Sequence, residues 1–182
     1  MTARPSASSS SQSIASDGDA GVISDSYVGT VTQRLISLCA ERFGAAARPE
    51  QVIQAASAVK PKGSIVARQA LRMNAVTLAA SYFRDFAPIS SAFVGSEIWV
   101  GPQPVDLIWK REGVIWIDEL KTGATPAGNT NEGLKLQVQA QWQAGAFEFG
   151  ENWGGVRAIL LDRPEHSFFV DASGSTQGEV PR

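Results

Sequence analysis

Residues 104–123 read PVDLIWKREGVIWIDELKTG and indicate two β-strands joined by a tight turn. Both hydrophobic halves are rich in β-branched and aromatic residues, and the Glu112-Gly113 pair between them is typical of a hairpin. Because side chains alternate faces along a strand, Glu119 and Lys121 share one face. The hairpin brings Asp106 beside them, so we expect two carboxylates and an ammonium group to meet at one end of the sheet.

This group of charges indicates divalent-metal chemistry. Two converging carboxylates repel each other unless a cation lies between them, and Mg²⁺ typically takes one or two carboxylates together with waters and substrate phosphate. A neighbouring lysine can orient the attacking water or stabilise charge that develops on the phosphate. Asp106 and Glu119 are therefore candidate ligands for Mg²⁺ or Mn²⁺ in phosphodiester hydrolysis. The competing interpretation is a structural α/β protein whose strands end in solvated charges.

The adjacent acids Asp118 and Glu119 leave a choice of metal ligand. Only residues i and i+2 of a strand share a face, so the alternation selects Glu119 as the partner of Lys121. Asp118 is expected to point to solvent or towards a neighbouring helix.

Helical and strand patterns divide the rest of the chain into two parts. Apolar residues at helical spacing predict helices over residues 27–43, 49–58 and 64–85, and Pro88 ends this helical part. Three strands, one helix and two strands then predict an α/β fold with a mixed central sheet flanked by helices. The strands are expected over residues 92–100, 105–110, 114–121, 156–161 and 167–170, and the late helix over residues 132–149.

Length and composition fit one domain. The 182 residues are 43% hydrophobic and 19% charged, as in ordinary globular proteins. Residues 1–25 and 172–182 are rich in small and polar residues, so we expect flexible tails there. The domain is expected over residues 26–171, with a helical part at 26–88 and a core at 92–170. The net charge of −2 gives no overall nucleic-acid signature, so a DNA-binding surface has to be local.

Cysteine content and hydropathy restrict the other site types. The single cysteine, Cys39, excludes an internal disulfide, a Cys₄ iron–sulfur cluster and a cysteine-based zinc site within one chain, and it is expected to be a small buried residue. No apolar run is as long as a membrane span, and the N-terminus lacks the pattern of a secretory signal. The expected location is therefore the cytoplasm, without a membrane partner.

Together, Pro104-Val105-Asp106 and the stretch from Glu119 to Gly123 resemble the motifs of the PD-(D/E)XK nuclease superfamily, most closely its RecB-like exonuclease branch. The resemblance covers about residues 92–170. It implies a restriction-endonuclease-like core in which Asp106, Glu119 and the carbonyl of Leu120 bind the metal and Lys121 is catalytic. The Lys-Thr-Gly ending is common in that branch. The iron–sulfur cysteines of some relatives are absent.

Two more family positions have candidates in this chain. The family places a glutamine on the helix after the motif, and residues 136–142 read LQVQAQW. Gln137 is the preferred candidate over Gln141, and Gln139 stays open, although the tyrosine of the family's Gln-x-x-x-Tyr pattern is absent. The candidate for the family's upstream acid is Glu97 on the preceding strand, and an ordinary surface residue of that strand explains Glu97 equally well.

Basic and aromatic residues suggest how a nucleic acid can be held. Four basic residues near the start of the third helix can contact phosphates without reading sequence, although a solvated helix face explains them equally well. Three tryptophans are expected to be packing residues, and one of them can instead stack on an unpaired base. The basic residues are Lys60, Lys62, Arg68 and Arg72, and the tryptophans are Trp99, Trp109 and Trp116.

The resemblance implies a Mg²⁺-dependent deoxyribonuclease that acts on single- or double-stranded DNA in processing, repair, mobile-element or defence settings. No Walker A motif is present, so any helicase partner has to be a separate chain. The alternative function is a catalytically inactive nuclease-fold module that binds nucleic acid or a protein partner.

Overall fold

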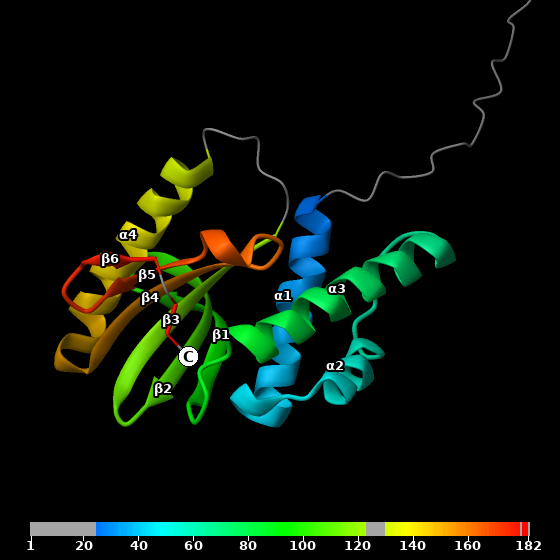
Figure 1. Cartoon of the computed structure of the whole chain (residues 1–182), viewed down its shortest axis with the longest axis horizontal. Helices are drawn as coiled ribbons and strands as arrows, with labels where there is room; N and C mark the ends of the chain where they lie inside the picture. Colours follow the sequence, from blue (N-terminus) through cyan, green and yellow to red (C-terminus); the bar gives the residue numbers. More distant parts are fainter. Residues whose placement is uncertain (1–24, 123–129, 179, 182) are drawn as a thin grey trace, which may run out of the picture.

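The computed structural model of the chain describes residues 25–122, 130–178, 180 and 181, and it has an α/β fold (Figure 1). Three helices precede an antiparallel meander of three strands, and a fourth helix connects the third strand to the fourth. This is the order predicted from the sequence. The elements are α1 (Asp25–Phe43), α2 (Pro49–Ala56), α3 (Ile65–Asp85), β1 (Ala92–Val100), β2 (Gln103–Arg111), β3 (Val114–Lys121), α4 (Thr130–Phe149), β4 (Trp153–Leu160), β5 (Phe168–Asp171) and β6 (Thr176–Gln177), with short 3₁₀ turns at Gly44–Ala46, Gly150–Asn152 and Pro164–His166.

The sheet is mixed, with the strand order β1-β2-β3-β4-β5-β6. Neighbouring strands are antiparallel except β3 and β4, which run parallel because α4 crosses over between them. The pairing of β2 with β3 ends at Leu107 and Asp118, whereas β3 stays paired with β4 as far as Lys121 and Leu160. On β2 the pairing therefore ends between Leu107 and Asp106, and on β3 it ends after Asp118, and the opening between these ends positions the candidate site.

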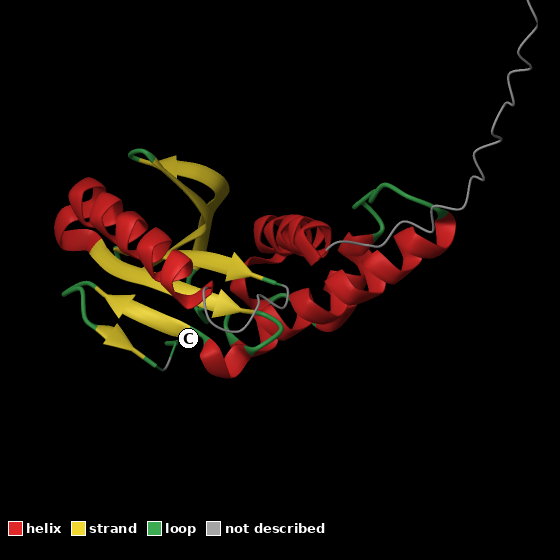
Figure 2. Cartoon of the chain, turned by 90° about the horizontal axis from the view of Figure 1, so that it is seen from above, coloured by secondary structure: helices red, strands yellow, loops and turns green. Residues whose placement is uncertain are grey.

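Helices cover both faces of the sheet, and each face has its own hydrophobic cluster (Figure 2). On one face, α1, α2 and α3 pack against Leu107, Trp109 and Leu120. On the other face, α4 packs against Ile108, Ile117 and several residues of β4 and β5. The apolar side chains of β2 and β3 are thus distributed over two cores, as expected for a sheet covered on both sides.

Local sequence signals set the helix bounds. Ser64 caps α3, since its hydroxyl oxygen accepts the N–H of Ala67 at 3.2 Å. Helix α1 ends at Gly44, whose φ of 67° is a conformation that glycine adopts without strain. Cys39 is fully buried in the cluster beneath α1, as predicted, and burial raises the pKa of its thiol to about 11.

Flexible tails were predicted at both ends of the chain. The tail predicted for residues 1–25 lies outside the described residues except for Asp25, which begins α1. Within residues 172–182, for which a flexible tail was predicted, Thr176 and Gln177 form the short strand β6 against β5. A turn held by the Asp171 carboxylate, which accepts the N–H of Ser173 at 2.9 Å, directs the chain back along the sheet.

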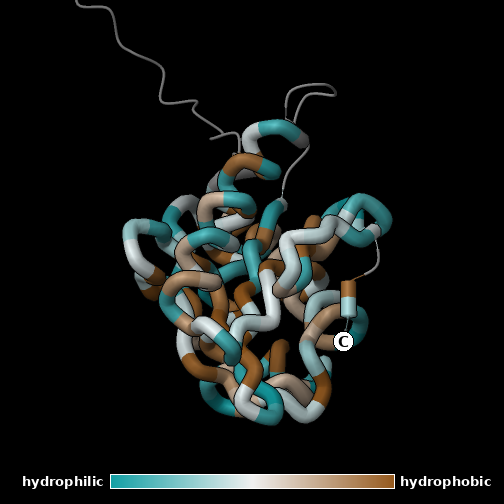
Figure 3. Tube along the Cα trace, turned by 90° about the vertical axis from the view of Figure 1, so that its left-hand side faces the viewer, coloured by the Kyte–Doolittle hydropathy of each residue, from teal (hydrophilic) through white to brown (hydrophobic). Residues whose placement is uncertain are grey.

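Hydrophobic and hydrophilic residues alternate at short intervals along the backbone (Figure 3). Accordingly, none of the helices in the described part of the chain has the length and apolar character needed to cross a membrane.

Candidate active site

Asp106 lies in the opening between β2 and β3 and connects three elements. Its Oδ2 accepts the backbone N–H of Leu120 on β3 at 2.7 Å, and its Oδ1 accepts Nε2 of Gln33 on α1 at 2.7 Å. Asp106 is the residue that would pair next with Glu119 if the ladder continued. Instead, the Leu120 N–H donates to the Asp106 carboxylate in place of a backbone carbonyl of β2. This hydrogen bond fixes the carboxylate beside the end of β3.

Glu119 is held from the other face of the sheet. Its side chain is only 2% exposed, and α4 supplies two donors to it. Gln137 Nε2 donates to Oε1 at 2.7 Å and Gln141 Nε2 donates to Oε2 at 2.6 Å, while Lys121 forms an ion pair with Oε1. The prediction that Glu119 and Lys121 share a face, and that Gln137 and Gln141 lie on one side of their helix, is confirmed.

Gln141 is more deeply engaged than the sequence suggested. It is fully buried, and its Nε2 also donates to the carbonyl of Pro104 at 2.9 Å, so it links α4 to the strand that carries Asp106. Its Oε1 has no hydrogen-bond partner among the described residues. A buried oxygen is costly to leave without a hydrogen-bond donor. The Oε1 atom of Gln141 is therefore a point at which a bound polar group could donate a hydrogen bond. Gln139 is exposed and points away from Glu119.

The two carboxylates carry charge that the surrounding groups do not fully balance. Burial, followed by the charge of Glu119, raises the pKa of Asp106 from 3.8 to about 7, although the Leu120 N–H and Lys121 act in the opposite direction. Lys121 is 41% exposed, so one end of this group is open to solvent. A divalent cation at this point would favour the ionised form of Asp106.

The oxygen donors present here fit a hard divalent cation. Asp106 and Glu119 supply two carboxylates, and the Leu120 C=O lies on the same side of β3 as its N–H, which faces Asp106. This set matches the one or two carboxylates that Mg²⁺ usually takes from a protein. In the described part of the chain, no group of three or more His, Cys, Asp or Glu side chains is arranged around one point.

A cavity of about 270 Å³ adjoins these groups on the side of α1. Gly29 lets α1 approach the end of β3, because a Cβ at this position would lie 2.5 Å from Oγ1 of Thr122. The cavity thus opens beside the exposed end of Lys121 and can receive part of a substrate. Its lining residues are Gly29, Thr30, Gln33, Leu120, Lys121, Thr122 and Leu161.

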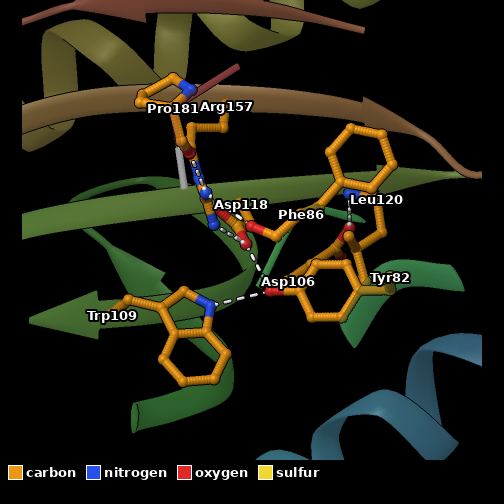
Figure 4. Close-up of polar contacts among 8 residues, drawn as sticks. All are labelled: Tyr82, Phe86, Asp106, Trp109, Asp118, Leu120, Arg157 and Pro181. Atoms are coloured by element: carbon orange, nitrogen blue, oxygen red, sulfur yellow. Dashed lines mark hydrogen bonds and ion pairs between the residues drawn. The ribbon is translucent and has the colours of Figure 1, made fainter. Parts of the chain in front are cut away.

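Asp118 belongs to a separate, buried polar network (Figure 4). Both of its oxygens accept hydrogen bonds from Arg157 on β4, at 2.7 and 2.6 Å, and Tyr82 Oη on α3 donates to Oδ2 at 2.6 Å. Trp109 Nε1 donates to the same Tyr82 oxygen at 3.0 Å, and burial together with Asp118 raises the pKa of Tyr82 well above its usual value. Asp118 therefore points towards a helix, which was one of the two predictions, and the solvent-facing alternative is wrong.

Arg157 also ties the end of the described chain to the core. Its Nη1 donates to the carbonyl of Phe86 at 2.9 Å and to that of Pro181 at 2.6 Å (Figure 4). The guanidinium is 1% exposed, and it donates four hydrogen bonds, two to the Asp118 carboxylate and one to each of these carbonyls. This network stabilises the sheet next to the candidate site without contributing a reactive group to it.

The remaining predicted residues are mostly exposed. Glu97 lies on β1 between Ser96 and Ile98, whose register partners are Leu107 and Val105, so its place along the ladder is opposite Asp106. Its side chain is exposed, and its φ of 52° departs from the extended backbone of a regular strand. Its role as a metal ligand stays a prediction. Lys60, Lys62 and Arg68 are exposed around the start of α3, whereas Arg72 donates to the carbonyl of Val59 at 3.2 Å and shapes the loop that carries the two lysines.

Gln33 is the residue of this site that the sequence did not reveal. It lies 73 positions before Asp106 on a helix whose pattern is read from its apolar residues, and no local motif marks it. Only the packing of α1 against the end of β3 brings it to the carboxylate.

Comparison of the sequence with known proteins found no match. No known family matches the sequence, and none of the curated proteins matches it.

Proposed function

We propose that this protein is a divalent-metal-dependent deoxyribonuclease of the PD-(D/E)XK type, related to the RecB-like branch. The observation that carries the proposal is the meeting of Asp106, Glu119 and Lys121 where β2 and β3 part. The mixed sheet covered by helices is compatible with this proposal, because the resemblance implies a central mixed sheet flanked by helices.

In this proposal, Asp106, Glu119 and the Leu120 carbonyl would hold Mg²⁺ or Mn²⁺. When bound, the ion supplies Lewis-acid activation of water and stabilises negative charge on the phosphate. Gln33 holds Asp106 from α1, and Gln137 and Gln141 hold Glu119 from α4. The two carboxylates are thus positioned from opposite faces of the sheet, which is the kind of support that precise ligand geometry requires.

Lys121 is the group of this chain that can act directly on the substrate. Lys121 is one of the residues that line the cavity beside α1, its ammonium pairs with Glu119, and its side chain is 41% exposed, so a scissile phosphate can approach it. In hydrolysis, a water oxygen forms a new bond to phosphorus, the bond to the departing sugar oxygen breaks, and that oxygen takes up a proton. Lys121 stabilises the charge that develops on the phosphate during this step.

Phosphates further along the nucleic acid have candidate contacts on the helical layer. Lys60 and Lys62 lie in the segment between α2 and α3, and the backbone N–H of Lys62 donates to the hydroxyl of Tyr27 on α1. This contact holds the basic segment next to the helix whose residues 29–33 border the cavity. Contacts of this kind add affinity that depends on salt and not on sequence.

Cleavage assays with linear and circular DNA test the proposal. The purified protein is expected to cut DNA in the presence of Mg²⁺ or Mn²⁺, and Lys121→Ala is expected to lower the rate by at least about 100-fold, as is typical when a donor to developing charge is removed. Lys135→Ala, on the exposed side of α4, serves as the control and should retain the wild-type rate. Equal rates for wild type and Lys121→Ala would contradict the proposal, and loss of the linear form alone would indicate an exonuclease.

One observation favours the alternative of an inactive nuclease-fold module. Each of the four carboxylate oxygens of Asp106 and Glu119 already accepts an N–H donor of the protein. Such a set can lock β2, β3, α1 and α4 together without any metal. DNA binding without cleavage under any divalent ion would support this alternative.

A further inference from the structure

Trp99 is an exposed tryptophan on the edge strand β1, close to the candidate site. Its side chain is 67% exposed, whereas Trp109 is fully buried and Trp116 packs against Phe169 with ring centroids 5.3 Å apart. Tryptophan is enriched at binding surfaces, because its ring offers a large apolar face together with a polar N–H group. Of the three tryptophans that the sequence offered as stacking candidates, Trp99 is the most exposed, and Trp116 is half-buried.

The register of the hairpin places Trp99 next to Asp106. Trp99 pairs with Pro104, which is two residues before Asp106 on β2. Residues opposite each other in an antiparallel pair share a face, as do residues i and i+2, so these three side chains project on the same side. Trp99 and Asp106 are diagonal neighbours, for which the Cα separation is roughly 7–8 Å.

The buried residues next to Trp99 and Asp106 show on which side of the sheet these two side chains lie. Val100 and Val105 point into the cluster under α4, so Trp99 and Asp106 point the other way. The bond from Gln33 on α1 to Asp106 agrees with this direction. The cavity lined by Gln33 and Lys121 lies on the same side, so Trp99 and the cavity flank Asp106.

We propose that Trp99 is a stacking platform for an unpaired nucleobase whose neighbouring phosphate approaches Lys121, so that the substrate is single-stranded DNA or an unpaired DNA end. This inference rests on the proposed nuclease function and deepens it. Aromatic rings bind successive bases through their faces without reading sequence, but a base within an intact duplex has no free face to offer. A ring beside the reacting phosphate therefore selects for unpaired nucleotides.

Fluorescence anisotropy of labelled oligonucleotides, in EDTA to suppress cleavage, measures binding directly. Trp99→Ala is expected to weaken the binding of a mixed-sequence single strand by about fivefold to 150-fold, the range that corresponds to the loss of one stacked base. Trp99→Phe should restore most of the affinity, and binding of a blunt duplex should be unchanged. Phe147→Ala is the matched control, because Phe147 is 91% exposed but belongs to the helix on the opposite face of the sheet.

Each result decides the inference. It is overturned if Trp99→Ala binds single strands as wild type does, if all substrates lose affinity equally, if Phe147→Ala shows the same loss, or if the wild-type protein binds no single strand. Failure of the nuclease proposal is distinguishable, since it requires that wild type cuts no DNA with Mg²⁺ or Mn²⁺. Stacking at Trp99 can still be observed in that case, and thermal unfolding of each variant verifies that the exposed substitutions leave the fold intact.

Discussion

Asp106→Asn is expected to stabilise the metal-free protein at alkaline pH. Burial and the neighbouring Glu119 raise the pKa of Asp106 to about 7, compared with 3.8 for an ordinary aspartate. The folded state therefore binds this proton more tightly than the unfolded state does. Stability contributed by the protonated carboxyl is fully present below about pH 4 and is lost as the pH rises to about 7.

The magnitude follows from the difference between the two pKa values. At about 1.4 kcal/mol for each pKa unit, the whole difference corresponds to at most about 4 kcal/mol. Asp106 is partly exposed, so solvent reduces this, and we expect about 2–4 kcal/mol. An asparagine at this position keeps its oxygen on the Leu120 N–H, and rotation of the Gln33 carboxamide lets its oxygen accept the new N–H group.

Urea denaturation at pH 4 and pH 8, in EDTA and followed by far-ultraviolet circular dichroism, measures this effect. The variant should unfold at a higher urea concentration than wild type at pH 8, and the two should nearly coincide at pH 4. Glu151→Gln, which neutralises an exposed carboxylate, should leave the free energy of unfolding nearly unchanged at both pH values. The reasoning is refuted if Asp106→Asn is less stable than wild type at pH 8, or if the difference is the same at the two pH values.

Addition of Mg²⁺ provides an independent readout of the same group. An ion that binds only the folded state raises its stability by mass action, by about 2.7 kcal/mol at 100 times the dissociation constant. Wild type at pH 8 should therefore gain stability with Mg²⁺, whereas Asp106→Asn should gain much less. An equal gain in the two proteins would show that the ion binds elsewhere.

Two further changes test the packing around the site. Arg157→Met leaves the Asp118 carboxylate buried without its partner and should cost about 3–5 kcal/mol in the free energy of unfolding, measured by urea denaturation. Gly145→Ala brings a Cβ within 2.3 Å of the Trp153 ring and should destabilise by about 1–3 kcal/mol, whereas Gly133→Ala on the same helix meets open space and should stabilise by about 0.5–1 kcal/mol. A stable Arg157→Met protein, or glycine variants of equal stability, would contradict these expectations.

The predictable part of the fold is the part that depends on local pattern. The glycine turn and the hydrophobic runs predicted β3 with its observed bounds, and strand alternation separated Glu119 from Asp118. Ser64 and Pro88 likewise marked the bounds of α3 to within a few residues. These signals succeed because each is a property of neighbouring residues along one element.

The unpredicted part depends on contacts between distant segments. Gln33 joins the site through the packing of α1, and Arg157 is read from the sequence as an ordinary strand residue although it neutralises Asp118. The preference for Gln137 over Gln141 also followed from a motif, whereas the structure gives Gln141 the more deeply buried contact. Short β6 was missed because a two-residue strand has no period to detect.

The pairing of Asp118 with Arg157 has a consequence for how such chains evolve. The two residues are direct register partners on β3 and β4, so replacing either one alone leaves a buried charge, while replacing both by apolar residues can be nearly neutral. Homologous sequences should therefore keep both or change both together, independently of Glu119 and Lys121. This covariation distinguishes an acid that holds the sheet, Asp118, from its neighbour in the chain, the candidate metal ligand Glu119.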